Sequence, residues 1–361
     1  MSADLDFTTY PEYSKTRENS LEEFKAGFQV FRDHVKDPNY LKHRTCIFET
    51  QPIGIMLRIN RNIWLTYRGK YYVIETVQGD YEKFSNLSCH FTDEVRSHGI
   101  KFPKKNANIC QGTPHEYWLK EGKAMVKDMS TRNPDFNSLP LHEKYHLVRE
   151  RLYTVYGKHN ECTTHRPTIP AWLYKHFEAK KVLDMCAGWG DRLIAAAACE
   201  CEYDGYDPNS ALIPCLNYAI KVINEVDPTL NLRVFQECIE TAQPDGEYDL
   251  AYTSPPYFTE EIYCKEKTQS VEKYATYNAW INGFLHGMLN TAINSVKDGG
   301  HIAINIVDFA GCKLIEPTIA YMNKRKQIYE GIIWYRVGRN YLGPIRIFRT
   351  TGCRGRNSPR E

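Results

Sequence analysis

The sequence predicts an α/β fold, in which a largely parallel sheet is covered by helices on both faces. From about residue 180 onward, short apolar runs alternate with helical patterns. Strands that alternate with helices form parallel sheets, because each crossover helix has to pack back on the sheet. The 361 residues are 42% hydrophobic and 25% charged, which is ordinary for a globular chain that buries a large core without disulfide or metal staples.

The first 160 residues differ from this rhythm and predict a separate α+β region. Apolar spacing predicts a helix over 21–35 and another over 139–156. Between them, the predicted strands are 45–49, 53–59, 63–67 and 71–77, followed by a polar loop over 101–113. We expect residues 1–160 to serve in recognition or partner binding, 161–350 to form the catalytic domain, and 351–361 to be a basic tail.

The second region predicts the elements of the sheet in order. The predicted strands are 182–185, 203–206, 230–235, 248–252 and 301–307, and the predicted helices are 191–198, 210–224 and 278–296. In sheets of this kind, ligands bind beyond the carboxyl ends of the strands. We therefore expect the functional residues to follow these strands directly.

The composition of the chain limits which binding partners and which cellular compartment we expect. The net charge of +2 shows no general basic excess, so a nucleic-acid partner has to be held by a local patch. Twelve cysteines include no C-x-x-C pair, which predicts free thiols in a reducing compartment and no metal site. Met1 to Tyr10 lacks a signal-peptide pattern, and no apolar run approaches the ~18 residues of a membrane span. We expect a soluble, cytoplasmic protein, nuclear if the source is a eukaryote, and the oligomeric state stays open.

A glycine-containing turn follows the first strand of the sheet. The stretch D-M-C-A-G-W-G-D covers 184–191, and glycines at 188 and 190 let the backbone turn tightly toward a ligand. The helix that follows points free amide groups at that ligand. A tight turn without any ligand is the alternative.

The second strand ends in an acid, Asp207, which can accept hydrogen bonds from the two hydroxyls of a ribose. Capping of the next helix is the alternative role for Asp207. The third glycine of a dinucleotide-binding turn, G-x-G-x-x-G, is absent, because Leu193 stands at its position after Arg192. A nucleoside with an amino-acid arm therefore fits better than a pyrophosphate.

The fourth strand ends in T-S-P-P-Y-F, residues 253–258, and this is the most specific signal in the chain. Prolines are poor strand formers, since each lacks a donor and fixes φ. The Ser254 hydroxyl and the main-chain carbonyl of Pro255 can accept hydrogen bonds from an amino group whose lone pair is delocalised into a ring. Tyr257 offers a flat face on which a base can stack. A proline-rich loop without function is the alternative.

These motifs resemble those of the class I S-adenosylmethionine-dependent methyltransferases. The family's first motif, D/E-x-x-x-G-x-G, is matched by Asp184, Gly188 and Gly190, and its second by Asp207. The resemblance implies a Rossmann-like sheet and S-adenosylmethionine as cofactor. The cofactor-binding residues that it implies are Asp184, Cys186, Ala187, Gly188, Gly190, Asp207, Glu237 or Cys238 beside the adenine, and Thr164 over the methionine end.

Within that family, the motif around Ser254 resembles the (D/N/S)-P-P-(Y/F/W) motif of amino methyltransferases, and T-S-P-P-Y looks most like the cytosine-N4 DNA enzymes. The resemblance covers about residues 164–348. It implies a site-specific DNA methyltransferase that modifies cytosine N4 or adenine N6 in DNA rather than RNA. The implied catalytic residues are Ser254, Pro255, Pro256 and Tyr257, with Tyr257 and Phe258 binding the substrate.

Several alternatives stay open. The motifs are also compatible with an enzyme that methylates an RNA base or a protein glutamine. They are equally compatible with an inactive partner subunit that has this fold. A cytosine-C5 enzyme is disfavoured, because the only Pro-Cys pair, Pro214-Cys215, falls in a predicted helix. Glu260 and Glu261 either orient the target or are simply solvated. Arginines 336, 339, 346, 349, 354, 356 and 360 either neutralise phosphates or line an edge strand and a tail.

Overall fold

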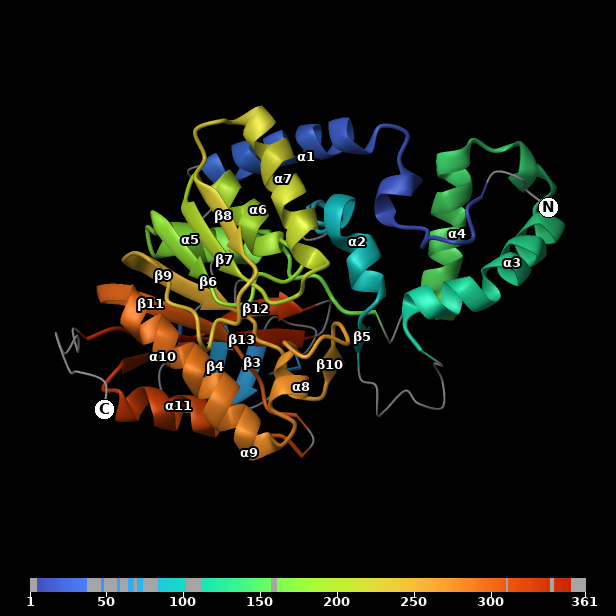
Figure 1. Cartoon of the computed structure of the whole chain (residues 1–361). Coiled ribbons are helices and arrows are strands. Elements are labelled where there is room, and N and C mark those ends of the chain that lie inside the picture. Colours follow the sequence, from blue (N-terminus) through green and yellow to red (C-terminus); the bar gives the residue numbers. More distant parts are fainter. Residues whose placement is uncertain are drawn as a thin grey trace.

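The computed structural model describes residues 5–37, 84–101, 112–156, 161–309, 311–337 and 341–351, and the backbone of four short strands between residues 47 and 73. The main sheet has the strand order β1-β12-β13-β11-β9-β6-β7-β8, and β2 pairs with β13. Strands β8, β7, β6, β9 and β11 run parallel, and β13 is antiparallel to β11. Helices cover both faces of the sheet (Figure 1), which confirms the predicted Rossmann-like α/β architecture.

The elements have the following bounds. The strands are β1 (Ile47–Phe48), β2 (Leu57–Arg58), β3 (Trp64–Tyr67), β4 (Lys70–Val73), β5 (Ile100–Lys101), β6 (Lys181–Asp184), β7 (Glu202–Tyr206), β8 (Leu232–Phe235), β9 (Tyr248–Thr253), β10 (Glu261–Ile262), β11 (Val296–Asn305), β12 (Ile328–Val337) and β13 (Tyr341–Arg349). The helices are α1 (Ser20–Lys36), α2 (Cys89–Ser97), α3 (Pro114–Arg132), α4 (Leu141–Val155), α5 (Thr168–His176), α6 (Asp191–Ala198), α7 (Leu212–Val226), α8 (Ser270–Lys273), α9 (Tyr277–Ala279), α10 (His286–Ser295) and α11 (Ile315–Lys324). The 3-10 helices are η1 (Tyr13–Thr16) and η3 (Pro134–Ser138), and η5 (Trp280–Leu285) is a π-helical stretch.

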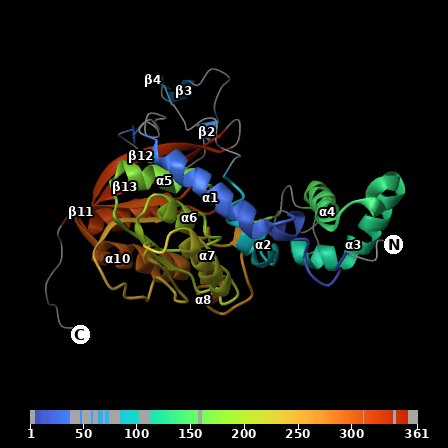
Figure 2. The ribbon, with the colours of Figure 1, turned by 90° about the horizontal axis from the view of Figure 1, so that it is seen from above.

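Helix α1 belongs to the body of the sheet domain, although it lies far from it in sequence. Phe24, Phe28, Phe31 and Val35 recur every three or four residues and are fully buried. They share one core with the alanine-rich α6 and with α7, and Figure 2 shows α1 lying across these helices. The amphipathic spacing that predicted the helix thus also determined which face packs on the sheet domain.

Residues 112–156 form a helical subdomain with a core of its own, built from α3, η3 and α4. Trp118, Phe136 and Val148 are fully buried in that core. A capping box of Thr113 and Glu116 starts α3, as its Thr-Pro-x-Glu sequence favours. The subdomain projects sideways from the sheet domain in both views (Figures 1 and 2).

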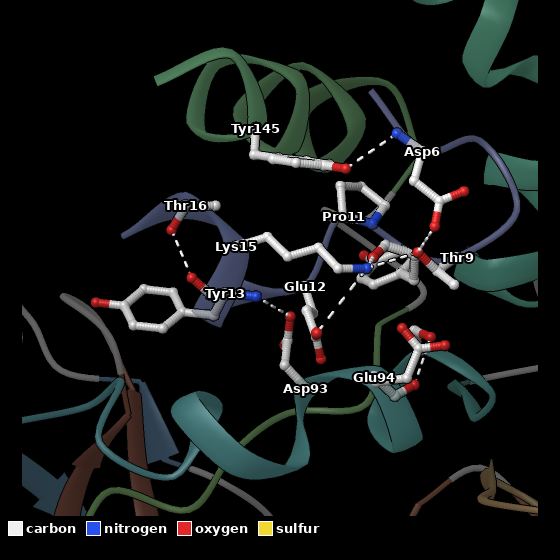
Figure 3. Close-up of polar contacts among 12 residues, drawn as sticks. Asp6, Thr9, Pro11, Glu12, Tyr13, Lys15, Thr16, Asp93, Glu94 and Tyr145 are labelled. Atoms are coloured by element: carbon white, nitrogen blue, oxygen red, sulfur yellow. Dashed lines mark hydrogen bonds and ion pairs between the residues drawn. The ribbon is translucent and has the colours of Figure 1, made fainter. Parts of the chain in front are cut away.

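Helix α2 joins the helical subdomain to the sheet domain. The Asp93 carboxylate on α2 accepts a hydrogen bond from the backbone amide of Tyr13 at 2.9 Å, and Arg149 of α4 donates two more to it. The segment around η1 is held between α2 and α4, since the Tyr145 hydroxyl accepts from the amide of Asp6 (Figure 3).

Several sequence predictions for the C-terminal half differ from the structure. The predicted helix 278–296 is α9, η5 and α10, and β11 starts at Val296 rather than at residue 301. Strand pairing explains the early start, because the amide of Gly299 donates to the Thr350 carbonyl and the Thr350 amide donates to Gly300. Strands β12 and β13 pair antiparallel inside the main sheet rather than at its edge.

The arginines of this hairpin are used within the fold where their side chains are described. Arg346 is fully buried and donates to the Ile306 carbonyl. Arg349 pairs with Glu330 at 2.8 Å. The side chains of Arg336, Arg339, Arg354, Arg356 and Arg360, and most of the predicted loop 101–113, lie outside the described residues. No helix in the described part of the chain is long and apolar enough to cross a membrane.

Candidate functional site

A cavity of about 640 Å³ opens where β6, β7, β9 and β11 end. This is the position that the strand-end rule predicted. Nine of the predicted site residues line the cavity: Thr164, Cys186, Ala187, Gly188, Asp207, Cys238, Ser254, Pro256 and Tyr257. The glycine turn and the S-P-P-Y motif, about 70 residues apart in the chain, therefore share one space.

The two glycines of the turn serve different purposes. Gly188 has φ of 53° and lines the cavity, and its amide donates to Asp207 Oδ2 at 3.0 Å. Gly190 has φ of 91°, and a Cβ there would lie 2.9 Å from Leu216 Cδ2. Gly188 therefore keeps the backbone open toward a ligand, whereas Gly190 allows α7 to approach the turn.

Asp184 lies behind the turn and does not line the cavity. Its side chain is fully buried and accepts hydrogen bonds from Arg192 Nε at 2.8 Å and from the Tyr203 hydroxyl at 2.6 Å. Its other oxygen accepts from the Cys186 amide at 3.3 Å, and Arg192 donates to the Cys186 carbonyl. Asp184 and Arg192 thus hold the turn in place through the backbone of Cys186.

Asp207 lies at the end of β7 with its carboxylate on the cavity. Its oxygens accept from the amides of Gly188 and Asn209, each at 3.0 Å. Burial raises the pKa of Asp207 to about 6. Each carboxylate oxygen keeps a second lone pair, so the side chain can still accept bonds from a pair of ribose hydroxyls.

Two neighbouring residues that sequence analysis did not select also line the cavity. Asp191 accepts from the Ser88 hydroxyl at 2.7 Å and from the His165 amide at 3.0 Å, and burial raises its pKa to about 7. His165 Nε2 lies 2.6 Å from the Tyr252 hydroxyl. Burial, and then the charge of Arg192, lower the pKa of His165 to about 3, so this imidazole stays neutral. The place of Asp191 directly after the glycine turn was the signal that could have identified it.

On the opposite side of the cavity, the S-P-P-Y motif lies beside the end of β11. The Tyr257 hydroxyl donates to the Asn305 carbonyl at 3.0 Å and lies 3.4 Å from Ser254 Oγ. Burial raises the pKa of Tyr257. The side chain of Asn305 donates to the Tyr335 hydroxyl at 2.8 Å, and Asn305, Asp308 and Phe309 all line the cavity. The strand-end rule, applied to this strand as well, would have selected them.

Five predicted site residues do not contribute to the cavity lining: Asp184, Gly190, Glu237, Pro255 and Phe258. Pro255 is buried and Glu237 is exposed. The Phe258 ring packs near Trp280 and Tyr277, with ring centroids 5.9 and 6.2 Å away. Phe258 thus packs against the core next to η5, and it supports the motif on the side away from the cavity.

The acids that follow the motif are not simply solvated. Glu260 and Glu261 line the cavity, and Glu261 is buried and accepts from the Tyr263 hydroxyl at 2.5 Å. The reason is strand β10, which contains Glu261 and pairs with β5 of the N-terminal region. Nothing in the local sequence indicated that partner.

The thiols at the cavity are not activated. Burial raises the pKa of both Cys186 and Cys238, so each stays protonated at neutral pH. Pro214 and Cys215 lie on α7, away from the end of β9. A covalent route through a cysteine thiolate has no support from these residues.

No protein-family model matches the sequence, and no curated protein is similar to it in sequence. The chain resembles solved structures over about half its length. TehB from Haemophilus influenzae is 13% identical with a TM-score of 0.34, over 56% of this chain and 66% of that one. NSun6 from Pyrococcus horikoshii is 12% identical with a TM-score of 0.38, over 53% of each chain. The chain therefore spans less than two thirds of either protein.

Magnesium protoporphyrin IX methyltransferase from Synechocystis, solved with bound SAM, is 11% identical with a TM-score of 0.37, over 51% of this chain and 77% of that one. Similarity at this level concerns the sheet, and the proposed function depends on the residues of the cavity instead.

Proposed function

We propose that this chain is an S-adenosylmethionine-dependent methyltransferase that modifies an exocyclic amino group of a nucleic-acid base, cytosine N4 or adenine N6, in DNA rather than RNA. One observation carries the proposal. The glycine turn with Asp207 and the motif Ser254, Pro256 and Tyr257 line a single cavity. A methyl donor on one side and an amine acceptor on the other would meet there.

The cofactor side has the donors and acceptors that a nucleoside with an amino-acid arm needs. Gly188 leaves its backbone open to the cavity, and Asp207 presents a carboxylate for the ribose hydroxyls. Cys238 and Ile239, which follow β8, provide an apolar wall at the place expected for the adenine. When bound, the cofactor supplies a methyl group on a positively charged sulfur.

The S-P-P-Y motif itself offers a hydrogen-bond acceptor and contains no carboxylate, although Glu260 and Glu261 line the same cavity. Ser254 Oγ, which lines the cavity, can accept a hydrogen bond from the amino group. Accepting this hydrogen bond directs the nitrogen lone pair toward the methyl group. The nitrogen would give up a proton to solvent as it takes the methyl group that the bound cofactor would supply. Alignment of this kind contributes roughly 7–11 kcal/mol to lowering a barrier.

The helical subdomain offers a local basic surface for a polyanion. Lys120, Lys123 and Lys127 of α3 are exposed and, at spacings of three and four, lie on one face of the helix. Phosphate contacts from such a face add affinity that falls with rising salt. The net charge of +2 required a patch of this kind, and α3 is a candidate for it.

The decisive experiment incubates the full chain with labelled S-adenosylmethionine and with pools of single-stranded DNA, duplex DNA, RNA and protein. We expect label in DNA, and mass spectrometry of the digested nucleosides should identify N4-methylcytosine or N6-methyladenine. Label confined to RNA nucleosides would support the alternative substrate. Label in protein glutamine, or cofactor binding without transfer to any pool, would contradict the proposal.

A further inference from the structure

Two histidines and a glutamate meet where α2 faces the start of α3, outside the cavity. Glu94 and His98 lie one turn apart on α2, and His115 lies in the first turn of α3. Glu94 Oε1 is 3.2 Å from His115 Nδ1 and 3.6 Å from His98 Nε2. The three side chains place one ligand atom each within 4.8 Å of one another.

Two atoms of this cluster are buried without a hydrogen bond. His115 Nδ1 and Glu94 Oε2 are both inaccessible, and within the described part of the chain neither has a hydrogen-bond partner. Leaving a buried polar atom unpaired destabilises the folded state. The contact between His115 Nδ1 and Glu94 Oε1 is close in distance but lacks the geometry of a hydrogen bond. A cation bound between Glu94 Oε1 and the histidines would satisfy His115 Nδ1.

We propose that Glu94, His98 and His115 bind a zinc ion. Zinc binds imidazole nitrogen at about 2.0–2.1 Å and carboxylate oxygen at about 2.0–2.2 Å, so two ligands at a tetrahedral angle lie about 3.3–3.5 Å apart. The separations of 3.2 and 3.6 Å between Glu94 and the two histidines are within about 0.1 Å of this spacing, and the ligand atoms of His98 and His115 lie within 4.8 Å of each other. His98 is half exposed, which leaves room for water as the fourth ligand.

The surrounding charges leave Glu94 available to a cation. The two lysines near the cluster each pair with a different carboxylate, Lys15 with Glu12 at 3.9 Å and Lys265 with Glu116 at 3.4 Å. Figure 3 shows Glu94 on α2, with the Lys15–Glu12 pair on the segment facing it. Neither lysine makes an ion pair with Glu94 in the described structure. The alternative is a simple ion pair between Glu94 and protonated imidazoles.

The position of the site gives it a structural role beyond the proposed function. Helix α2 packs on the sheet domain through Phe91, and α3 belongs to the helical subdomain through Trp118. Zinc would therefore link the two bodies at a second point, next to the contacts of Asp93 with Arg149. The sequence offered little signal, since His115 is far from the Glu94–His98 pair along the chain and no cysteine is involved.

The test uses the full chain after removal of metals with a chelator, titrated with zinc chloride in a calorimeter. We expect a single ion to bind per chain. His98→Gln and His115→Gln should each weaken zinc binding at least about tenfold. Losing a residue that only supports a metal ligand already has an effect of that size, and these substitutions remove the ligand itself. His146→Gln is the matched control, because His146 on α4 also faces an acid one turn away, Glu150 at 3.5 Å, but has no third ligand. Its zinc affinity should equal that of the wild type.

Two further measurements identify the ligands and the linkage. Cobalt in place of zinc should give a visible spectrum without a thiolate charge-transfer band, and that band would assign the metal to cysteines and overturn the proposal. Zinc should also slow amide hydrogen exchange in the first turn of α3, where His115 lies. Equal zinc binding by wild type and His98→Gln would refute the site without any concern about folding, since His98 is half exposed.

Discussion

The two sides of the cavity are built in different ways. On the cofactor side, the turn after β6 rests on a buried ion pair, Asp184 with Arg192, and on the carboxylates of Asp191 and Asp207. On the acceptor side, Ser254, Pro256 and Tyr257 are uncharged, and Tyr257 is held by a bond to a backbone carbonyl. Buried charges hold the turn after β6, whereas a hydrogen bond to a backbone carbonyl holds the motif after β9.

This difference separates the effects that substitutions should have. Buried charges are costly to leave without a partner, so changes on the cofactor side should reduce stability or cofactor affinity. Uncharged acceptors act only while the substrate reacts, so changes on the acceptor side should reduce turnover and leave the fold intact.

The largest expected effect is on stability, from Asp184→Asn. Arg192 would remain buried with its main partner gone, which should lower the free energy of unfolding by about 3–5 kcal/mol. Asp204→Asn is the matched comparison, since Asp204 is also buried but pairs with Arg233, whose side chain is 47% exposed to water. Urea denaturation should show a clearly smaller loss for Asp204→Asn. Equal losses would show that the Asp184–Arg192 pair is not a special support of the turn.

Ser254→Ala should have the next largest effect, and on the reaction alone. Removing one preorganised hydrogen-bonding group from a reacting centre typically costs about 10²–10³ in kcat. Cofactor affinity, measured by calorimetry, should stay unchanged because Ser254 lies across the cavity from Asp207. Ser138→Ala serves as the control, because Ser138 is an exposed residue at the end of η3 and far from the cavity lining in the sequence. Turnover near the wild-type value on the true substrate would remove Ser254 from the mechanism.

Asp207→Ala should weaken S-adenosylmethionine binding about tenfold or more, because a hydrogen bond to a charged group contributes about 1.5–3 kcal/mol. Calorimetric titration of the full chain measures this directly. Asp245→Ala, at an exposed acid on the same domain, should bind like the wild type. If both variants bind equally well, Asp207 only caps the following helix.

The smallest effect is the pH dependence of cofactor affinity. Burial raises the pKa of Asp207 to about 6, so protonation below pH 6 removes its negative charge and part of its accepting capacity. Affinity should fall with decreasing pH below 6, by at most about tenfold per pH unit. The free protein responds in the opposite sense, because a raised pKa contributes stability that is full below the unfolded value of about 3.9 and is lost as pH rises through about 6. In Asp207→Asn the slope of affinity near pH 6 should be reduced, with Asp191 still titrating near pH 7.

Sequence patterns predicted the sheet domain well because its signals are local. The helices over 21–35 and 191–198 match α1 and α6 within a residue at each end, and the strands from β6 to β9 match within two. The helices α2, α3 and α11 and the hairpin β12–β13 were not assigned. Their form depends on packing, as Arg346 illustrates, since a buried arginine in a strand looks like a surface residue in the sequence.

The site could be predicted only where a motif follows a strand directly. Gly188, Asp207 and Ser254 lie on the cavity because strand ends converge at one edge of a parallel sheet. Glu261 and Asp191 depend on partners from the N-terminal region, strand β5 and Ser88, and no local pattern contains those contacts. Phe258 shows the converse, because an aromatic next to a motif was assumed to face the ligand and instead packs on Trp280.

Helix α2 reaches the cofactor turn as well as the helical subdomain. The Ser88 hydroxyl donates to Asp191 and the Thr92 hydroxyl donates to the Trp189 carbonyl at 3.0 Å, while Asp93, the next residue, holds Arg149. A shortened chain that starts at residue 161 would lose these donors and expose the surface that Phe24 and Phe28 cover. The smallest unit able to fold around the cavity therefore includes α1 and α2 from the N-terminal region, and an attempt to express the sheet domain by itself should yield an aggregating fragment.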